Sequence, residues 1–322
     1  MDLYQALDKI KPHLKMSSMK TYVTIIEKLH EAMYDHRSIQ DLHWLVTDKE
    51  RIMKMLLLKP DSTNRNYLNA ITIFLQHENR DTYRDLQEWQ EYSQARDDLN
   101  DKMAKAIQLN LRTDRQKKNW ITPEEYQHVL DQIESTLRQS KIFSAKCDSL
   151  SRDQARKYQE YVLLRLYEKV PSRNDFATVC VTTKRQYNEN HHDDKNYLVL
   201  ERDNYHFMLH DWKTKTAELD QRQILLSTRL QKVIRLFLRK FSSRPYLFMN
   251  SSGDGPLTRN GLTKLMVNVF KQFYPDRSIS TTMLRHVFLT HKYGQTLDDM
   301  KQDANNLGHS LKTQKDYIVN DY

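Results

Sequence analysis

Apolar residues recur every three or four positions along most of the first hundred residues, which is the spacing of helices that bury one face. Four segments show this period: 17–33, 48–58, 62–76 and 81–111. In the first, the apolar face is formed by Tyr22, Ile25, Ile26, Leu29 and Met33. Ser17 or Ser18 could cap that helix. The pattern therefore predicts a small helical domain at the start of the chain.

A basic connector follows this helical region. Four cations stand close together in it: Arg112, Arg115, Lys117 and Lys118. Directly after them, Thr122 can act as an N-cap, Pro123 suits the first helical turn, and Glu125 completes a capping box. These signals predict a domain boundary near residue 115, with a helical domain over 1–115 and a second domain over 116–322.

The pattern changes in the middle of the second domain. After a helical segment at 152–169, four runs are rich in β-branched and aromatic residues: "DFATVCV", "NYLVLE", "YHFMLHDW" and "RQILLS". Helical periods resume over 228–240, 258–273 and 281–293. We expect a mainly α fold with a small antiparallel β-sheet in the C-terminal half.

Charge narrows the class of partner. The 322 residues include 51 Lys and Arg against 42 Asp and Glu, a net charge of +9, which suits nucleic acid first and an anionic membrane second. No apolar run approaches the roughly 18 residues that span a bilayer, and the first residues lack the layout of a signal peptide. Two cysteines cannot form a disulfide framework or a zinc site alone. We expect a soluble intracellular protein without a membrane partner.

Two further stretches contain residue types found in metal sites or phosphate-binding loops, but the surrounding sequence does not favour either kind of site. The run "NENHHDDKN" contains His191, His192, Asp193 and Asp194, but adjacent side chains diverge, so a solvated hairpin loop is predicted in place of a metal site. The run "SSGDGP" is a turn before a helix that starts near Thr258, since it lacks the context of a phosphate-binding loop. No metal, ATP or NAD site is predicted.

Five residues in a fixed order carry the chemistry. Arg173 stands in "VPSRNDFATV", Lys213 in "HDWKTKTAE", Arg285 in "STTMLRHVFLTH", and His309 and Tyr317 in "LGHSLKTQKDY". This order resembles the tyrosine recombinase (phage integrase) family, and "LRH…TH…G" and "LGHS…Y" are its specific part. The resemblance covers roughly the whole chain. Residues 1–115, with "SSMKTY", are similar to the family's core-binding domain, and 116–322 to its catalytic domain.

The resemblance implies a role for each of the five residues, and the chemistry of a phosphodiester needs those roles. Cleavage without a metal requires a nucleophile, cations for the growing charge and an acid for the leaving oxygen. Tyr317 would attack and form a 3′-phosphotyrosine, while Arg173 and Arg285 would hold the non-bridging oxygens. His309 would donate a hydrogen bond or assist proton transfer, and Lys213 would protonate the 5′-oxygen.

The sequence departs from the family pattern and leaves alternatives open. Thr282 stands where the family usually has His or Lys, and the neighbouring His286 points about 100° away around the helix. Phe176 occupies the position of a frequent acid, with Asp175 one residue earlier. Lys215 and Lys184 compete with Lys213 for the role of acid, and Tyr293 and Tyr322 compete with Tyr317 for that of nucleophile.

DNA contacts are expected from both domains. The candidates are Lys20, Arg65, Arg112, Arg115, Lys117 and Lys118, which would contact phosphates without reading sequence. The resemblance implies a homo-tetramer on paired double-stranded DNA sites, working where that DNA is, in a prokaryotic cytoplasm or in a nucleus or viral replication site. Two alternatives stay open: a type IB topoisomerase or telomere resolvase, and a DNA-binding protein with a degenerate catalytic domain.

Overall fold

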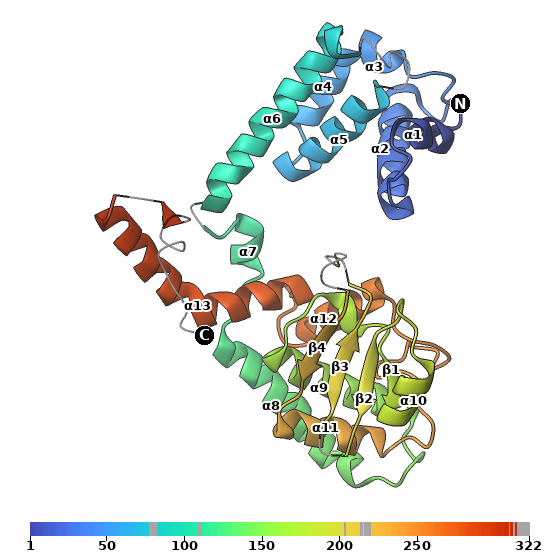
Figure 1. Cartoon of the computed structure of the whole chain (residues 1–322), viewed down its shortest axis with the longest axis vertical. Coiled ribbons are helices and arrows are strands. Elements are labelled where there is room, and N and C mark those ends of the chain that lie inside the picture. Colours follow the sequence, from blue (N-terminus) through green and yellow to red (C-terminus); the bar gives the residue numbers. More distant parts are fainter. Residues whose placement is uncertain are drawn as a thin grey trace. The chain divides into compact units, whose positions relative to one another are not determined.

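A computed structural model describes residues 1–76, 83–108, 111–202, 204–212, 215, 220–308, 310, 311 and 313. The chain divides into two compact units, Met1–Leu111 and Arg112–Tyr322 (Figure 1). This division lies a few residues before the predicted boundary at 115. Each unit has its own buried apolar core.

The first unit is helical in its described part. Its elements are α1 (Leu3–Ile10), α2 (Met16–Tyr34), α3 (Trp44–Thr47), α4 (Lys49–Leu57), α5 (Asp61–Phe74), η1 (Tyr83–Asp85) and α6 (Gln87–Gln108). They pack around a core that includes Val23, Ile26, Ile71, Phe74 and Tyr92. The predicted caps Ser17 and Ser18 are wrong, because α2 begins at Met16 and both serines lie inside its first turn.

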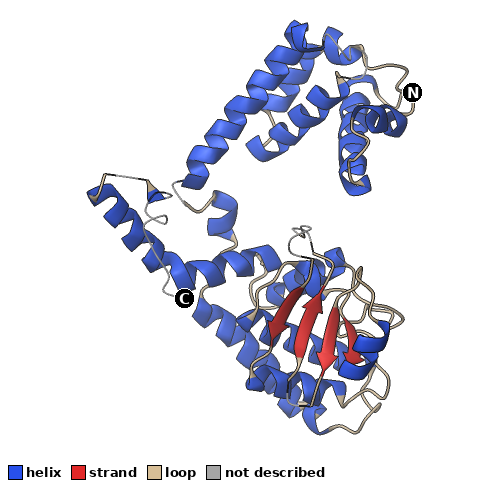
Figure 2. Cartoon of the chain, viewed as in Figure 1, coloured by secondary structure: helices blue, strands red, loops and turns tan. Residues whose placement is uncertain are grey.

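The second unit combines helices with a sheet (Figure 2). Its helices are α7 (Asp114–Lys118), α8 (Pro123–Gln139), η2 (Ile142–Ser144), α9 (Arg152–Lys169), η3 (Asn174–Phe176), α10 (Lys184–Asn190), α11 (Thr228–Leu238), α12 (Arg259–Lys271) and α13 (Thr281–Asn306). The capping box predicted at Thr122 and Glu125 is confirmed at the start of α8. Helix α13 is longer than the predicted 281–293, because Gly294 lies inside it without ending it.

The sheet is mixed, so the prediction of an antiparallel sheet is wrong in part. Its strands are β1 (Cys180–Thr183), β2 (Tyr197–Leu200), β3 (His206–Leu209) and β4 (Arg222–Leu225), in the order β1-β2-β3-β4. β2, β3 and β4 pair antiparallel, but β1 pairs parallel to β2. Helix α10 forms the crossover that two neighbouring parallel strands require. The stretch 188–196 is therefore part of this crossover and not a hairpin loop.

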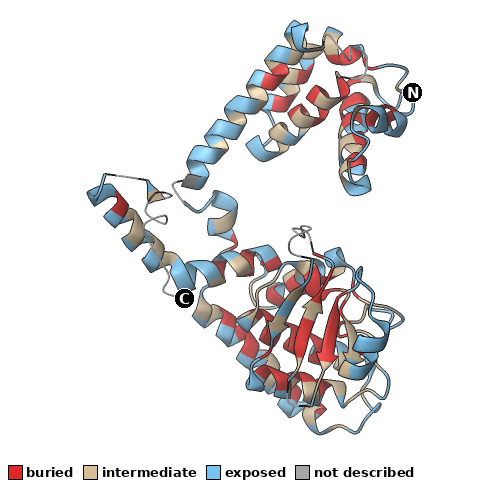
Figure 3. Ribbon diagram, viewed as in Figure 1, coloured by how far each residue is buried: buried red, intermediate tan, exposed pale blue. Residues whose placement is uncertain are grey.

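Helix α9 lies at the centre of the second unit. Residues 158–167 are buried on all sides of the helix, since α8, α11, α12 and α13 all contact it. Figure 3 shows the buried residues concentrated on the central strands and on the helices behind them. The carboxyl end of α9 leads directly into the segment that carries Arg173. Among the described residues, no helix is long and apolar enough to cross a membrane.

Candidate functional site

Arg285 lies in the first turns of α13 and is held from the segment after α9. Its Nε donates a hydrogen bond to the carbonyl oxygen of Pro171 at 3.2 Å. Its Nη2 is buried and has no hydrogen-bond partner among the described residues. A buried guanidinium N–H without an acceptor is uncommon, and it provides a donor for a ligand.

Arg173 is exposed at the start of η3, on a backbone segment that is fixed from several sides. The hydroxyl of Tyr167 donates to the carbonyl of Arg173 at 2.6 Å. Asn174 donates to Thr263 of α12 at 2.7 Å and accepts from Thr281, the first residue of α13, at 2.6 Å. These bonds join the segment to the start of α13, so the fold brings Arg173 close to Arg285.

A third arginine, Arg222, joins them from β4 and was not predicted from the sequence. Its Nη2 donates to the hydroxyl of Ser172 at 3.2 Å and lies 3.4 Å from the carboxylate of Asp175. Its guanidinium lies 5.9 Å from the ring centre of Trp212, and its Nε is buried without a partner in the described part of the chain. Asp175 therefore pairs with Arg222, while Phe176 is a core residue.

These side chains border one hollow of about 550 Å³, which we call the arginine hollow. Its basic residues are Lys169, Arg173, Arg222, Arg285 and Lys292, and Asp175 is its acidic one. Trp212, Ile224 and Phe288 form apolar parts of its wall. Among the described residues, five cations around one carboxylate make the hollow strongly positive.

The pKa of Arg285 reflects this concentration of charge. Burial lowers it most, and the positive charge of Arg173 lowers it further, with a smaller contribution from Arg222. Tyr167 and Asp175 act in the opposite direction. An arginine still stays protonated at neutral pH, so the protein holds mutually repelling cations in place. An anion with several acceptor oxygens would relieve this repulsion and satisfy the unpaired N–H groups.

Asn196 is a second residue that the sequence did not single out. It is fully buried, and its side-chain oxygen accepts from the backbone N–H groups of His210 and Asp211 at 2.9 and 2.8 Å. Its amide nitrogen donates to the carbonyls of Asp175 and Asp211 at 3.0 and 2.8 Å. Asn196 thus joins the segment of Asp175 to the residues that follow β3, close to Trp212 on the wall of the arginine hollow.

Three of the five predicted residues, Lys213, His309 and Tyr317, lie outside the described residues, as does the rival Tyr322. Gly308, which precedes His309, has φ +73° and follows the last turn of α13, a left-handed conformation that glycine commonly adopts at a helix C-terminus. Of the other rivals, Lys184 is partly buried at the start of α10, and Tyr293 is exposed on α13. Lys215 is also exposed and lies 3.5 Å from the carbonyl of Asp193.

Thr282 and His286 are exposed on α13, and neither is among the described residues that border the arginine hollow. Thr282 therefore makes no visible replacement for the His or Lys of the family pattern. Arg222 supplies a positive charge to the site from a different element.

The side chains predicted to contact phosphates differ in their exposure and in whether they already have a partner within the protein. Lys20, Arg115 and Lys118 are exposed. Arg112 stacks on Trp120, with 3.6 Å between the guanidinium carbon and the ring centre, and Lys117 pairs with Asp114 at 3.3 Å. Arg65 is partly buried, and its Nε has no partner among the described residues.

The histidine-rich crossover does not gather a metal site in the part of the chain that is described. His191 lies 3.6 Å from the carboxylate of Asp193, and its Nδ1 lies 3.1 Å from the carbonyl oxygen of Tyr187.

No protein-family model, curated protein or solved structure matches this chain.

On the expectation that the arginine hollow holds a DNA phosphate, replacing Arg222 with methionine should weaken DNA binding through loss of one phosphate contact. We expect the slope of log Kobs against log salt concentration to fall by about 1 for a 30-base-pair duplex, as measured by fluorescence anisotropy. Arg185→Met, which removes an exposed arginine on α10 away from the hollow, is the matched control. An unchanged slope in a folded Arg222→Met variant would remove Arg222 from the site.

Proposed function

We propose that this protein is a metal-independent DNA strand transferase of the tyrosine recombinase kind. The observation that carries the proposal is the arginine hollow, where Arg173, Arg222 and Arg285 converge with two buried N–H groups that lack acceptors among the described residues. Planar guanidinium groups match the spacing of phosphate oxygens. A phosphodiester of DNA is the anion that the positive net charge of the chain also favours.

The reaction would proceed by direct displacement at phosphorus. The phenolic oxygen of Tyr317 forms a bond to phosphorus, and the bond to the 5′-oxygen breaks. Lys213 gives a proton to that oxygen, and the phenolic proton of Tyr317 passes to His309 or to water. When water takes that proton, His309 donates a hydrogen bond to the phosphate. The arginines hold the non-bridging oxygens and stabilise their added charge in the transition state. Attack by a second 5′-hydroxyl on the phosphotyrosine reverses these steps and releases the enzyme without ATP.

The wider assembly follows from the same family resemblance. We propose that double-stranded DNA is the partner and that a homo-tetramer on paired DNA sites exchanges strands. The same arginines would serve a type IB topoisomerase or a telomere resolvase, which act on a single DNA molecule. A DNA-binding protein with a degenerate catalytic domain is less favoured. Thr282 brings no charge to the arginine hollow, but Arg222 adds one from β4.

The test is a covalent trapping experiment in EDTA. Nicked suicide duplexes with randomised sequence are incubated with the full chain, and adducts that survive SDS are separated on a denaturing gel. We expect an adduct for the wild type, none for Tyr317→Phe, and an undiminished adduct for Tyr293→Phe, because only Tyr317 has the family spacing from His309.

The possible results separate the alternatives. No adduct on duplexes that the protein binds would overturn the catalytic proposal and leave a DNA-binding protein. Loss of the adduct in Tyr293→Phe alone would assign the nucleophile to Tyr293. Relaxation of a supercoiled plasmid without paired sites would point to the topoisomerase activity in place of recombination.

A further inference from the structure

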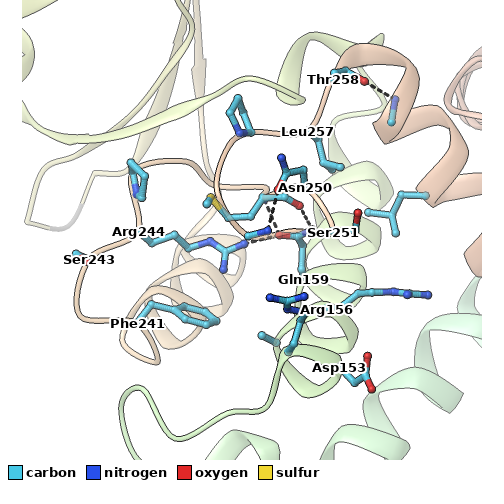
Figure 4. Close-up of a pocket in the computed structure, with 18 of the residues that line it drawn as sticks. Asp153, Arg156, Gln159, Phe241, Ser243, Arg244, Asn250, Ser251, Leu257 and Thr258 are labelled. Atoms are coloured by element: carbon cyan, nitrogen blue, oxygen red, sulfur yellow. Dashed lines mark hydrogen bonds between the residues drawn. The ribbon is translucent and has the colours of Figure 1, made fainter.

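Arg244 lies outside the arginine hollow, among neutral hydrogen-bond partners and aromatic rings. Arg244 follows α11, and its Nε donates to the carbonyls of Tyr246 and Leu247 at 3.0 and 3.3 Å. Its Nη2 donates to the side-chain oxygen of Gln159 on α9, as Figure 4 shows. The guanidinium carbon lies 4.7 and 4.6 Å from the ring centres of Phe237 and Phe241. Every one of these partners is neutral.

Arg244 therefore has no counter-ion in the part of the chain that the structure describes. No carboxylate of the described residues forms an ion pair with it, and in the same set its Nη1 has no hydrogen-bond partner. Burial lowers the pKa of Arg244 to about 10, which still leaves the group charged at neutral pH. Arg244 is partly buried. A cation that is partly removed from water without an anion costs free energy, and a ligand carboxylate would offset part of that cost.

Arg244 borders a cavity of about 720 Å³ that has apolar walls and a basic mouth. The walls include Phe241, Met249, Pro256, Leu257 and Leu265. Around the mouth, Arg152 and Arg156 of α9 and Lys264 of α12 are exposed. We call this cavity and the hollow beside it the α9–α12 groove.

The adjoining hollow measures about 600 Å³ and makes the groove elongated. It shares Asp153, Arg156 and Asn268 with the cavity and adds Lys157 and Lys271. Small-molecule sites are usually single pockets of about 300–1,000 Å³. Two joined hollows along a pair of helices fit an extended chain better than a compact ligand.

Two helix N-termini add to the positive potential of the groove. Helix α9 begins at Arg152 after the cap Ser151, and α12 begins at Arg259 after the cap Thr258. Asp153, Thr258 and Gly261 from these first turns border the cavity. The positive ends of helix dipoles favour anions, here in support of the unpaired Arg244.

The acids near the groove do not neutralise this charge. Asp148 accepts a hydrogen bond from the backbone N–H of Ser242 at 2.9 Å, and Glu160 pairs with Arg156 at 3.1 Å. Asp153 is the remaining acid of the lining. Arg152, Lys157, Lys264 and Lys271 leave the groove with a net positive charge.

We propose that the α9–α12 groove binds an acidic peptide segment of a partner protein, with apolar side chains in the cavity and a carboxylate on Arg244. The apolar walls favour a peptide over nucleic acid, whose phosphates would leave the walls exposed. The site does not depend on the proposed strand transfer. It shares no lining residue with the arginine hollow, and Gln159 precedes Lys169 by about 15 Å along α9.

The test uses a fluorescein-labelled twelve-residue peptide that repeats Asp-Leu-Glu-Phe, and a matched peptide with Asn and Gln in place of its acids. Anisotropy is measured with the full chain. We expect the acidic peptide to bind, and Arg152→Glu and Lys264→Glu each to weaken binding about tenfold, whereas Arg185→Glu on α10 leaves it unchanged. Arg244→Gln should weaken binding at least thirtyfold, because it removes the partly buried, charged partner of the carboxylate.

Three results would overturn the proposal. Equal binding of the amide peptide would show that charge plays no part. Unchanged affinity in Arg152→Glu and Lys264→Glu would remove the groove from the site even if Arg244→Gln fails to fold. Tighter binding of a single-stranded 12-mer oligonucleotide, lost in the same variants, would assign the groove to nucleic acid.

Discussion

If the protein has the proposed strand-transfer activity, replacing Arg285 with methionine should lower the rate of covalent DNA adduct formation by about 10² to 10³, the usual effect of removing one donor to a developing oxyanion. The reason is that Arg285 offers the site a buried Nη2 without an acceptor among the described residues. Its Nε is already bound to Pro171, so the guanidinium is held in orientation before DNA arrives. The rate is measured on the nicked duplexes under single-turnover conditions.

The melting temperature of the Arg285→Met variant shows whether Arg285 acts in the site or stabilises the fold. Because Arg173 and Arg222 repel Arg285, the methionine variant should melt at the same temperature as the wild type or slightly higher. Inorganic phosphate should raise the melting temperature of the wild type more than that of the variant. His286→Ala, on the same helix but outside the hollow, is the control and should leave the rate unchanged. A parallel fall of stability and rate would mean that Arg285 is structural.

Local signals in the sequence were sufficient to predict most of the helices and the capping box at the start of one of them. The three-to-four spacing of apolar residues predicted α2, α4 and α5, and the polar pattern at Thr122 and Glu125 predicted the capping box of α8. The same reasoning failed at Ser17 and Ser18. There the helix starts earlier, in a turn that buries Met19 and has no side-chain cap.

Features that depend on distant segments could not be predicted. The strand runs were recognised, but the parallel pairing of β1 with β2 depends on α10, a short polar helix without a periodic apolar face. Arg222 is the first residue of β4, a position where an arginine is usually exposed and carries no signal of a site. Its contacts with Ser172 and Asp175 form only when the sheet is packed. The available signal in the sequence was its spacing from Ile224. Residues two apart in a strand point to the same face of the sheet, and Ile224 lines the same hollow.

Of the five predicted site residues, only Arg173 and Arg285 are described, and the sequence order alone did not predict how they meet. Arg173 and Arg285 stand far apart in sequence, and the fold brings them together through Asn174, which binds both α12 and the first residue of α13. Buried asparagines such as Asn196 have no periodic or motif signal, because their partners are backbone groups of other segments.

Replacing Arg165 with methionine should destabilise the second unit by about 3 kcal/mol, because it leaves a largely buried carboxylate with fewer partners. Arg165 is 8% exposed on α9 and contacts Glu134 of α8 at 2.6 Å. Its other partners are Glu168 at 3.2 Å and the hydroxyl of Tyr161 at 3.1 Å, which itself donates to Glu134 at 2.8 Å. The free energy of unfolding is measured in urea. Glu189→Gln, which breaks an exposed ion pair on α10, should have little effect.

The same network gives stability a defined dependence on pH. Burial alone would raise the pKa of Glu134, but hydrogen bonds from Arg138, Tyr161 and Arg165 outweigh it and lower the pKa from 4.5 to about 2. A carboxyl with a depressed pKa in the folded state stabilises the protein above its unfolded pKa, and this contribution is lost as pH falls from 4.5 towards 2. Glu134→Gln should therefore be much less stable than the wild type at pH 7, and the difference should shrink below pH 4.5 by about 1.4 kcal/mol per pH unit. A difference that stays constant from pH 7 to pH 3 would show that Glu134 contributes packing and hydrogen bonds but no charge, because only the charged form of the carboxyl makes the stability depend on protons.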